Sequence, residues 1–224
     1  MTTSQDDFSI QIKQIDAWQA PEDQAGSGLV IHTSRGDIQA IAHHGEAGTA
    51  TRGIVWVWGA NGGFAGPADG IFNDLAEQFK PDITSIRINY RDPRVLHESV
   101  LDALVGVSFL AGTGHTEIAL VGHSFGGAVV ISAAPFSERV KAVVALSSQT
   151  MGATKAADVS PRPLLLVHGQ EDIRLPPRCS ELIYDWALEP KELKLYPEAG
   201  HGLMQCKDEL REFLSGWLVG KLGA

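Results

Sequence analysis

Residues 118–127 read Ile-Ala-Leu-Val-Gly-His-Ser-Phe-Gly-Gly, and this segment is the most informative one about the fold. Its four leading apolar residues are typical of a buried strand, and the small, apolar residues 127–134 predict a buried helix. Between them, Gly122, Ser124 and Gly126 form a Gly-x-Ser-x-Gly pattern. In a strand-turn-helix context this pattern predicts a sharp turn with a strained backbone that lifts the serine hydroxyl above the sheet. The alternative is a glycine-rich turn with an idle serine.

Short apolar runs alternate with helical patterns on both sides of this stretch. Apolar residues at helical spacing predict helices over 96–107 and 210–218, and a shorter pattern spans 71–79. The alternation predicts an α/β fold with a mostly parallel central sheet and helices on both faces. The runs predicted to be strands are 54–58, 85–89, 118–121, 142–146, 164–167 and 193–196.

The N-terminal part of the chain predicts a different, antiparallel edge of the sheet. Residues 9–13 alternate between polar and apolar side chains, as a half-buried strand does. The apolar stretches 29–31 and 38–41 flank a turn at 34–37 that contains a glycine. Two such stretches around a short turn predict a β-hairpin.

Length and charge limit the classes of partner. The 224 residues, 44% hydrophobic and 20% charged, suit one domain over 1–224, with residues 1–8 expected to form a flexible tail. The formal net charge of −9, without a dense Lys/Arg cluster, argues against nucleic acid and anionic membranes as partners.

The cysteines and the first residues bear on location. Cys179 and Cys206 form no Cys-x-x-Cys pair, so two reduced thiols and a cytoplasmic location are expected. Residues 1–7 lack a basic stretch followed by an apolar run, so no signal peptide is expected. The apolar runs are also too short to span a bilayer.

Residues 122–127 resemble the nucleophile elbow of the α/β-hydrolase superfamily, with His123 at its variable position, and the resemblance extends over roughly 28–220. It implies an α/β-hydrolase fold with nucleophile, acid and histidine in that order. In this fold a lid enters where 147–163 lie here, which leaves room for one short helix and no separate lid domain. These proportions resemble the small dienelactone-hydrolase-like and carboxylesterase branches. Dienelactone hydrolases carry a cysteine at the elbow, so Ser124 departs from that branch.

The resemblance also implies the acid and the base. Residues 167–172 read Val-His-Gly-Gln-Glu-Asp, which is similar to the family's His-Gly-x-x-Asp loop and places the acid at Asp172, with Glu171 as the alternative. Residues 198–202 read Glu-Ala-Gly-His-Gly and place the base at His201. A serine hydroxyl needs such a base near pH 7, and a buried carboxylate holds the imidazole in the right tautomer. The alternative for the histidine is an ordinary loop residue.

An attacked carbonyl becomes an oxyanion, which needs N–H donors. One expected donor is the backbone N–H of Phe125, directly after the nucleophile. The other is expected in residues 59–63, Gly-Ala-Asn-Gly-Gly, at Ala60 or at Asn61. This loop is similar to the family's His-Gly-x-Gly-Gly loop, with Trp58 where a histidine is common. The alternative is an ordinary glycine-rich loop.

The remaining candidates carry less weight. His168 is expected to pack or to form a hydrogen bond, and His43 and His44, beside a turn, are expected at the surface. None of the histidines falls in a metal-binding pattern, and no nucleotide-binding loop is complete, so neither a metal nor a cofactor is expected. Trp56, Trp58 and Phe64 are candidates for the wall of an acyl pocket, although ordinary core packing is expected for Trp56 because it lies in a buried strand.

The sequence therefore predicts a serine hydrolase with an open, shallow site that cleaves a small carboxylic ester or thioester through an acyl-enzyme on Ser124. Two alternatives remain. One is perhydrolase-type or other acyl-transfer chemistry on the same three residues, and the other is a non-enzymatic binding protein on the hydrolase scaffold. The expected partner is the small-molecule substrate, and the sequence gives no oligomeric state.

Overall fold

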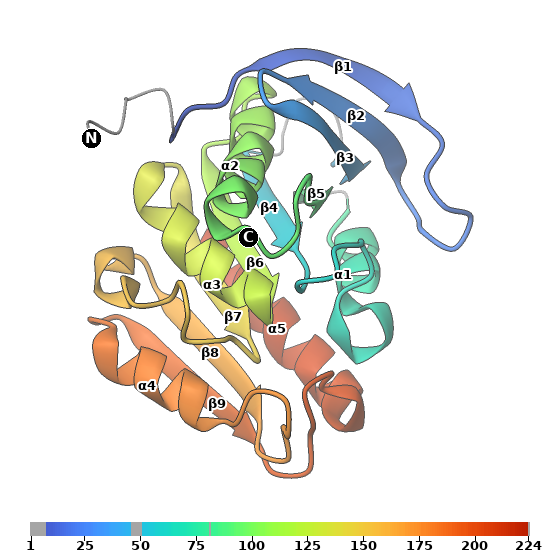
Figure 1. Ribbon diagram of the computed structural model, residues 1–224. Coiled ribbons are helices and arrows are strands. Elements are labelled where there is room, and N and C mark those ends of the chain that lie inside the picture. Colours follow the sequence, from blue (N-terminus) through green and yellow to red (C-terminus); the bar gives the residue numbers. More distant parts are fainter. Residues whose placement is uncertain (1–7, 46–50, 81, 224) are drawn as a thin grey trace.

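The computed structural model describes residues 8–45, 51–80 and 82–223 (Figure 1). The predictions for residues 1–7, a flexible tail without a signal peptide, lie outside these described residues. Phe8, the last residue of the expected tail, is described, and its ring centroid lies 4.8 Å from that of Phe136.

Nine strands in the described part of the chain form one sheet in the order β1-β2-β3-β5-β4-β6-β7-β8-β9. β1, β2, β3 and β5 pair antiparallel, and all pairs from β5 to β9 are parallel. The mostly parallel sheet with an antiparallel N-terminal edge is therefore confirmed. The strands are β1 (Ile12–Trp18), β2 (Ser27–Thr33), β3 (Gly36–His43), β4 (Arg52–Val57), β5 (Thr84–Asn89), β6 (Glu117–His123), β7 (Val140–Leu146), β8 (Leu164–Gly169) and β9 (Lys191–Tyr196).

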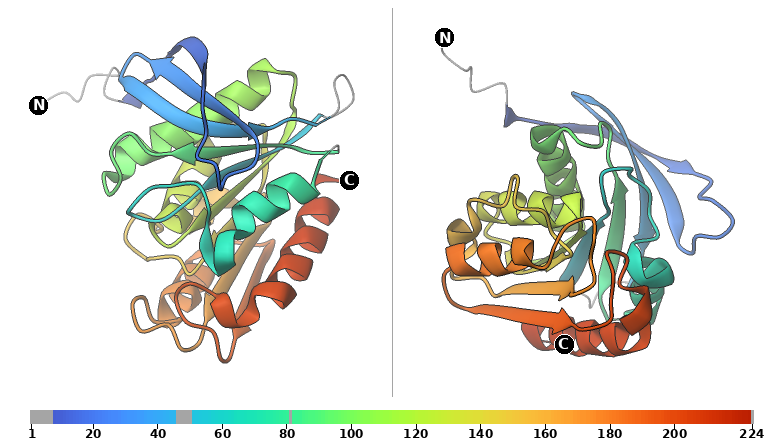
Figure 2. Two further views of the ribbon diagram at one scale, coloured as in Figure 1. Left: turned by 90° about the vertical axis from the view of Figure 1, so that its right-hand side faces the viewer. Right: turned by 60° about the horizontal axis from the view of Figure 1, so that its bottom comes forward.

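Helices cover both faces of this sheet, and each face has its own core (Figure 2). α2, α3 and α4 pack on one face, and α1 and α5 pack on the other. Parallel strands that are buried on both faces carry mostly apolar residues, which explains their nearly continuous apolar runs. The helices are α1 (Pro67–Gln78), α2 (Leu96–Gly112), α3 (Phe125–Ala133), α4 (Arg178–Trp186) and α5 (Lys207–Leu222).

The first strand differs from its prediction. The alternation at residues 9–13 predicts a strand there, but β1 begins at Ile12 and continues to Trp18. It pairs with β2, whose last residue, Thr33, lies opposite Ile12. Gln11 already lies beyond the partner strand and contacts the hairpin turn, where its carbonyl accepts from the Ser34 N–H. The length of the partner strand sets this boundary, and local alternation does not reveal it.

The topology places several loops at one edge. The carboxyl ends of parallel strands meet at the same edge of a sheet, and β6 has parallel neighbours on both sides.

The connection from β7 to β8, residues 147–163, carries one turn of 3₁₀ helix at Ala156–Val159, in keeping with the single short helix expected there. None of the helices in the described ranges combines the length and apolar composition needed to cross a bilayer.

Candidate active site

Ser124 occupies the turn between β6 and α3, with φ 59° and ψ −118°. This positive φ is rare for a residue with a side chain and is the strained conformation that the sequence predicts. The two glycines of the pattern make the turn possible. A Cβ on Gly122 would lie 2.0 Å from the Gly126 carbonyl oxygen, and a Cβ on Gly126 would lie 2.3 Å from the carbonyl oxygen of Trp58. Glycine at both positions therefore lets the turn pack against itself and against the end of β4.

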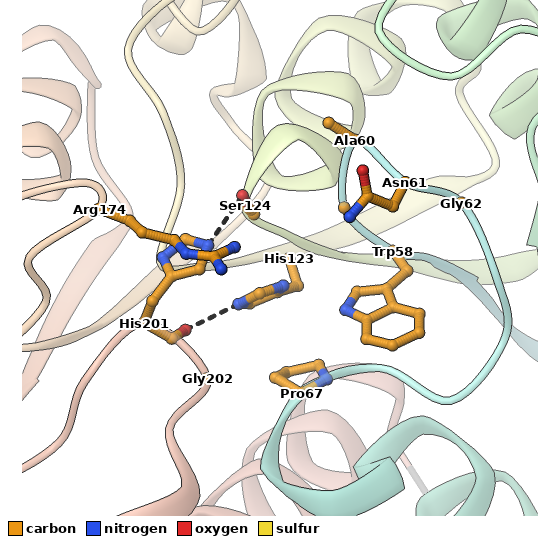
Figure 3. Close-up of a pocket in the computed structure, with 11 residues that line it drawn as sticks. Trp58, Ala60, Asn61, Gly62, Pro67, His123, Ser124, Arg174, His201 and Gly202 are labelled. Carbon is orange, nitrogen blue, oxygen red and sulfur yellow. Dashed lines mark hydrogen bonds between the residues drawn. The ribbon is translucent and has the colours of Figure 1, made fainter.

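Three side chains that are distant in the sequence form one hydrogen-bonded chain at this turn (Figure 3). The Oγ of Ser124 lies 3.1 Å from Nε2 of His201, and Nδ1 of His201 lies 2.7 Å from Oδ2 of Asp172. A carboxylate only accepts, so Nδ1 carries the hydrogen and Nε2 presents its lone pair to the serine hydroxyl. The structure thus brings together the three residues that the sequence analysis singled out.

The Asp172 carboxylate is buried, and both of its oxygens accept hydrogen bonds. Its Oδ1 accepts from the backbone N–H groups of Arg174 and Leu175, at 2.8 and 3.0 Å. Its Oδ2 faces both His201 and His168, at 2.7 and 3.1 Å. Burial raises the pKa of this carboxyl, but the hydrogen bonds from Leu175, His201 and Arg174 outweigh it, and the pKa lies below its ordinary value. The group is therefore an anion that orients the imidazole.

Glu171, the alternative acid, does not share this environment. Its side chain is exposed to solvent, while the Asp172 side chain is inaccessible. The backbone N–H of Glu171 donates to the Ala199 carbonyl, 3.0 Å away, and so ties the acid loop to the histidine loop. The structure brings Asp172, and not Glu171, to the imidazole.

His123 holds the histidine loop against the elbow. Its Nε2 lies 2.9 Å from the carbonyl oxygen of His201, so Nε2 carries the hydrogen and donates it (Figure 3). Burial lowers the pKa of His123 to about 4, which leaves the ring neutral near pH 7. A second tie comes from the start of α1, where the Ala68 N–H donates to the Gly202 carbonyl at 2.8 Å.

Backbone N–H groups without protein acceptors lie at the elbow and in the loop after β4, two segments that both line the cavity beside Ser124. Phe125 is the first residue of α3, so its N–H has no acceptor within the helix. In the loop after β4, Gly62 donates to the Gly59 carbonyl and Gly63 donates to Oδ1 of Asn89. Within the described residues, this leaves the N–H groups of Ala60 and Asn61 without an acceptor.

A cavity of about 480 Å³ opens beside the serine. It is lined by loop residues 58–62, by Pro67 and by residues of the elbow and of the histidine loop (Figure 3). Arg174 is the charged side chain among its described lining residues. Trp58 lies in the wall, as the sequence suggested, whereas Phe64 is buried with its ring 6.0 Å from Trp18. Among the described residues, Trp58 therefore supplies the indole wall of the cavity, and the expectation for Phe64 is wrong.

The surface position expected for His43 is also wrong. His44 is exposed, but His43 is fully buried at the end of β3. Its Nδ1 meets the Glu77 carboxylate on α1, and its Nε2 accepts from Nε of Arg87 at 3.0 Å. Burial lowers the pKa of His43 to about 4. The partners of this histidine lie on α1 and β5, 34 and 44 positions away in the sequence, so the nearby turn was a misleading signal.

Sequence reasoning missed the roles of His123, Pro67 and Arg174. The position of His123, next to Ser124 at the end of a buried strand, was a usable signal, because a buried histidine needs a hydrogen-bond partner. Arg174 follows the acid by two residues, but no local pattern shows that its side chain turns into the cavity. His168 behaves as expected, since it is buried and hydrogen-bonded.

Comparison with solved structures identifies the fold of the protein. The chain resembles Est1E from Butyrivibrio proteoclasticus, with a TM-score of 0.73 and 16% identity over 89% of this chain and 100% of that one. The esterase domain from a Rhodothermus marinus protein gives 0.70 and 16%, with 94% and 100% covered. An alpha-beta serine hydrolase homologue from Coxiella burnetii gives 0.68 and 18%, with 93% and 98% covered. At these identities the likeness shows a shared fold, that of the α/β hydrolases.

Sequence comparison identifies the family to which the chain belongs. The sequence profile of the dienelactone hydrolase family matches residues 60–214. The chain belongs to this family and is a hydrolase of the α/β-hydrolase type. A curated relative, the uncharacterized protein YfhR of Escherichia coli (strain K12), is 45% identical over 56 residues. That match covers 25% of this chain and only 20% of YfhR.

Proposed function

We propose that this protein is a serine hydrolase that cleaves a carboxylic ester or thioester through an acyl-enzyme on Ser124. The observation that carries the proposal is the hydrogen-bonded chain from the Ser124 hydroxyl through His201 to the anionic Asp172, which lies at an open cavity. Serine, base and acid in this arrangement are the parts that acyl transfer requires.

In the first half of the reaction, Nε2 of His201 takes the proton of the Ser124 hydroxyl as Oγ bonds to the carbonyl carbon. The carbonyl oxygen becomes an oxyanion, which the N–H of Phe125 and an N–H of Ala60 or Asn61 stabilise. The tetrahedral carbon then releases the alcohol or thiol, whose oxygen or sulfur takes the proton from the imidazolium. Asp172 stabilises the imidazolium without taking its proton.

In the second half, water replaces the departed alcohol or thiol. His201 takes one proton from the water while its oxygen attacks the acyl carbon of the ester on Ser124. The second tetrahedral intermediate breaks its bond to Oγ, and Oγ recovers the proton from the imidazolium. The products are the free carboxylic acid and the original enzyme, so neither redox chemistry nor a cofactor is required.

The surroundings of the site support a small or exposed acyl group. The short β7–β8 connection leaves the cavity open, and the aromatic Trp58 provides an apolar wall. We propose that the chain acts as one domain without a lid. The cytoplasmic location expected from Cys179 and Cys206 remains a prediction.

The experiment compares the wild type with Ser124→Ala, and with Ser215→Ala as the matched control on the surface of α5. With an activated short-chain ester, the wild type and the control should release a burst of leaving group, and Ser124→Ala should not. A fluorophosphonate probe should label the first two proteins only. Unchanged turnover in Ser124→Ala, or an unlabelled wild type, contradicts the proposal.

A further inference from the structure

The loop that carries Ala60 and Asn61 is held by the segment that follows β5. The Tyr90 hydroxyl donates to the Trp58 carbonyl at 3.0 Å, at the start of the loop. At its far end, Oδ1 of Asn89 accepts from the Gly63 N–H at 2.8 Å. Two consecutive residues of one strand end therefore fix both ends of this loop.

Arg94 holds the middle of the same loop. Its Nε donates to the Ala60 carbonyl at 3.3 Å, and its Nη2 donates to Oδ1 of Asn61 at 3.1 Å. Arg94 itself has a φ of 82°, a backbone conformation that residues with side chains rarely adopt and that persists where surrounding contacts fix it. The arginine is exposed, so its contacts with the loop are not a consequence of burial in the core.

The contact with Asn61 determines which way the carboxamide faces. A guanidinium group only donates hydrogen bonds, so the atom that meets it must be the carboxamide oxygen. The amide nitrogen, Nδ2, then points to the other side, and Figure 3 shows the oxygen turned towards Ala60 and the nitrogen turned away from it. Asn61 lines the cavity, and within the described part of the chain its Nδ2 has no protein acceptor.

We infer that Arg94 is a positioning residue for the oxyanion loop and that it turns the Asn61 carboxamide into the cavity as a further hydrogen-bond donor to the substrate. This inference rests on the proposed function. The two-pronged guanidinium fixes the Ala60 carbonyl and the Asn61 side chain together, so the loop meets the reacting carbonyl with its donors already oriented. A preorganised donor costs no rearrangement during the reaction, so it stabilises the transition state more than the ground state.

Four variants separate the parts of this inference. Arg94→Met removes both hydrogen bonds, and Arg94→Lys keeps the positive charge but loses the two-pronged geometry. Asn61→Asp keeps an acceptor for Arg94 but removes the amide donor. Arg211→Met is the matched control. Arg211 lies on the surface of α5, outside the cavity lining, and forms an ion pair with Asp74.

The assay is the Ser124-dependent hydrolysis of an activated short-chain ester, together with urea unfolding of each variant. Loss of one oxyanion donor costs on the order of 10²–10³ in kcat, and an indirect effect is smaller. We therefore expect Arg94→Met to lower kcat by about 10- to 100-fold with KM changed less than about threefold. Arg94→Lys should lose nearly as much, and Asn61→Asp at least about tenfold. All the variants should stay folded.

A transition-state analogue gives a readout that a merely structural role would not move. Inhibition by a boronic acid, which forms a tetrahedral anion on a serine, should weaken in parallel with kcat, while inhibition by the product alcohol should not change. Full activity in Arg94→Lys would assign the effect to charge alone and overturn the positioning role. Asn61→Asp with the activity of Arg211→Met would overturn the donor role. These outcomes are distinct from failure of the proposed function, in which Ser124→Ala retains the wild-type activity.

Discussion

His168 shares the Oδ2 atom of Asp172 with the imidazole of His201. Its Nε2 lies 3.1 Å from that oxygen and 2.9 Å from the Leu175 carbonyl, and its Nδ1 lies 2.7 Å from the Ser180 hydroxyl. The carboxylate and the carbonyl only accept, so Nε2 carries the hydrogen and Nδ1 accepts from the serine. A neutral, fully buried histidine therefore donates a second side-chain hydrogen bond to the Asp172 carboxylate.

We expect His168→Phe to weaken both folding and activity. The change leaves the buried Ser180 hydroxyl without its acceptor and removes one donor from Asp172. Each unsatisfied buried group costs about 1–3 kcal/mol, so urea unfolding should show a loss of at least this size. Because the acid is held less firmly, kcat should also fall. His97→Phe, at an exposed position on α2, is the control, and equal stability of the two variants would contradict the prediction.

Comparing Asp172→Asn with Glu171→Gln tests which of the two carboxylates orients the imidazole. An amide at position 172 no longer stabilises the imidazolium and favours the wrong tautomer, so kcat should fall by about 10²- to 10⁴-fold. The adjacent Glu171→Gln makes the same chemical change at an exposed side chain and should leave kcat within about twofold. If Glu171→Gln were the more damaging of the two, the acid would be misassigned.

Stability should fall as the pH is lowered from 6.5 towards 4. Burial lowers the pKa of His123 to about 4 from an ordinary value of 6.5. Between these values the unfolded chain binds a proton that the folded protein excludes, so this stability is complete above pH 6.5 and is lost as the pH falls. At pH 5 the loss for this one buried residue is about 2 kcal/mol.

Urea unfolding at pH 7.5 and pH 5 measures this loss. His123→Gln removes the titrating ring but can still donate to the His201 carbonyl, so its stability should change less between the two pH values. An equal change in the wild type and in the variant would show that other groups cause the effect. Asp172 acts in a separate window, because its lowered pKa places its contribution below pH 3.8.

Two glycine substitutions should change the free energy of unfolding in opposite directions. Gly122→Ala would bring a Cβ within 2.0 Å of the Gly126 carbonyl oxygen, so the elbow must shift, and we expect the free energy of unfolding to fall by about 3 kcal/mol. Gly216→Ala adds its Cβ in open space on the exposed face of α5 and should stabilise the protein by about 0.5–1 kcal/mol. Equal effects in urea unfolding would contradict the packing described at the elbow.

The extent of sequence-based prediction follows from the range of each interaction. The elbow around Ser124 was predictable because a strand, a turn and a helix lie within one short stretch, and the spacing of its glycines reports the close packing directly. The loops at Asp172 and His201 were found because each follows an apolar strand in an order that the resemblance supplied. The strand order was only partly accessible, since β5 precedes β4 in the sheet.

The contacts that sequence reasoning missed are those between distant elements. His43 is buried by partners on α1 and β5, and the two-pronged contact of Arg94 joins residues 33 and 34 positions apart. No local period records such pairs. A polar side chain on a buried strand shows that a partner must exist, but it does not identify that partner.

The position of β8 and β9 at the last edge of the sheet has a consequence for biogenesis. Ser124 and its turn belong to the middle of the chain, but the loops that follow β8 and β9 supply Asp172 and His201. During synthesis, a ribosome-bound chain can complete the elbow well before the imidazole has emerged. We expect such a nascent chain to be inactive. Hydrolysis of a fluorogenic ester would therefore show when β8 and β9 have added to the sheet.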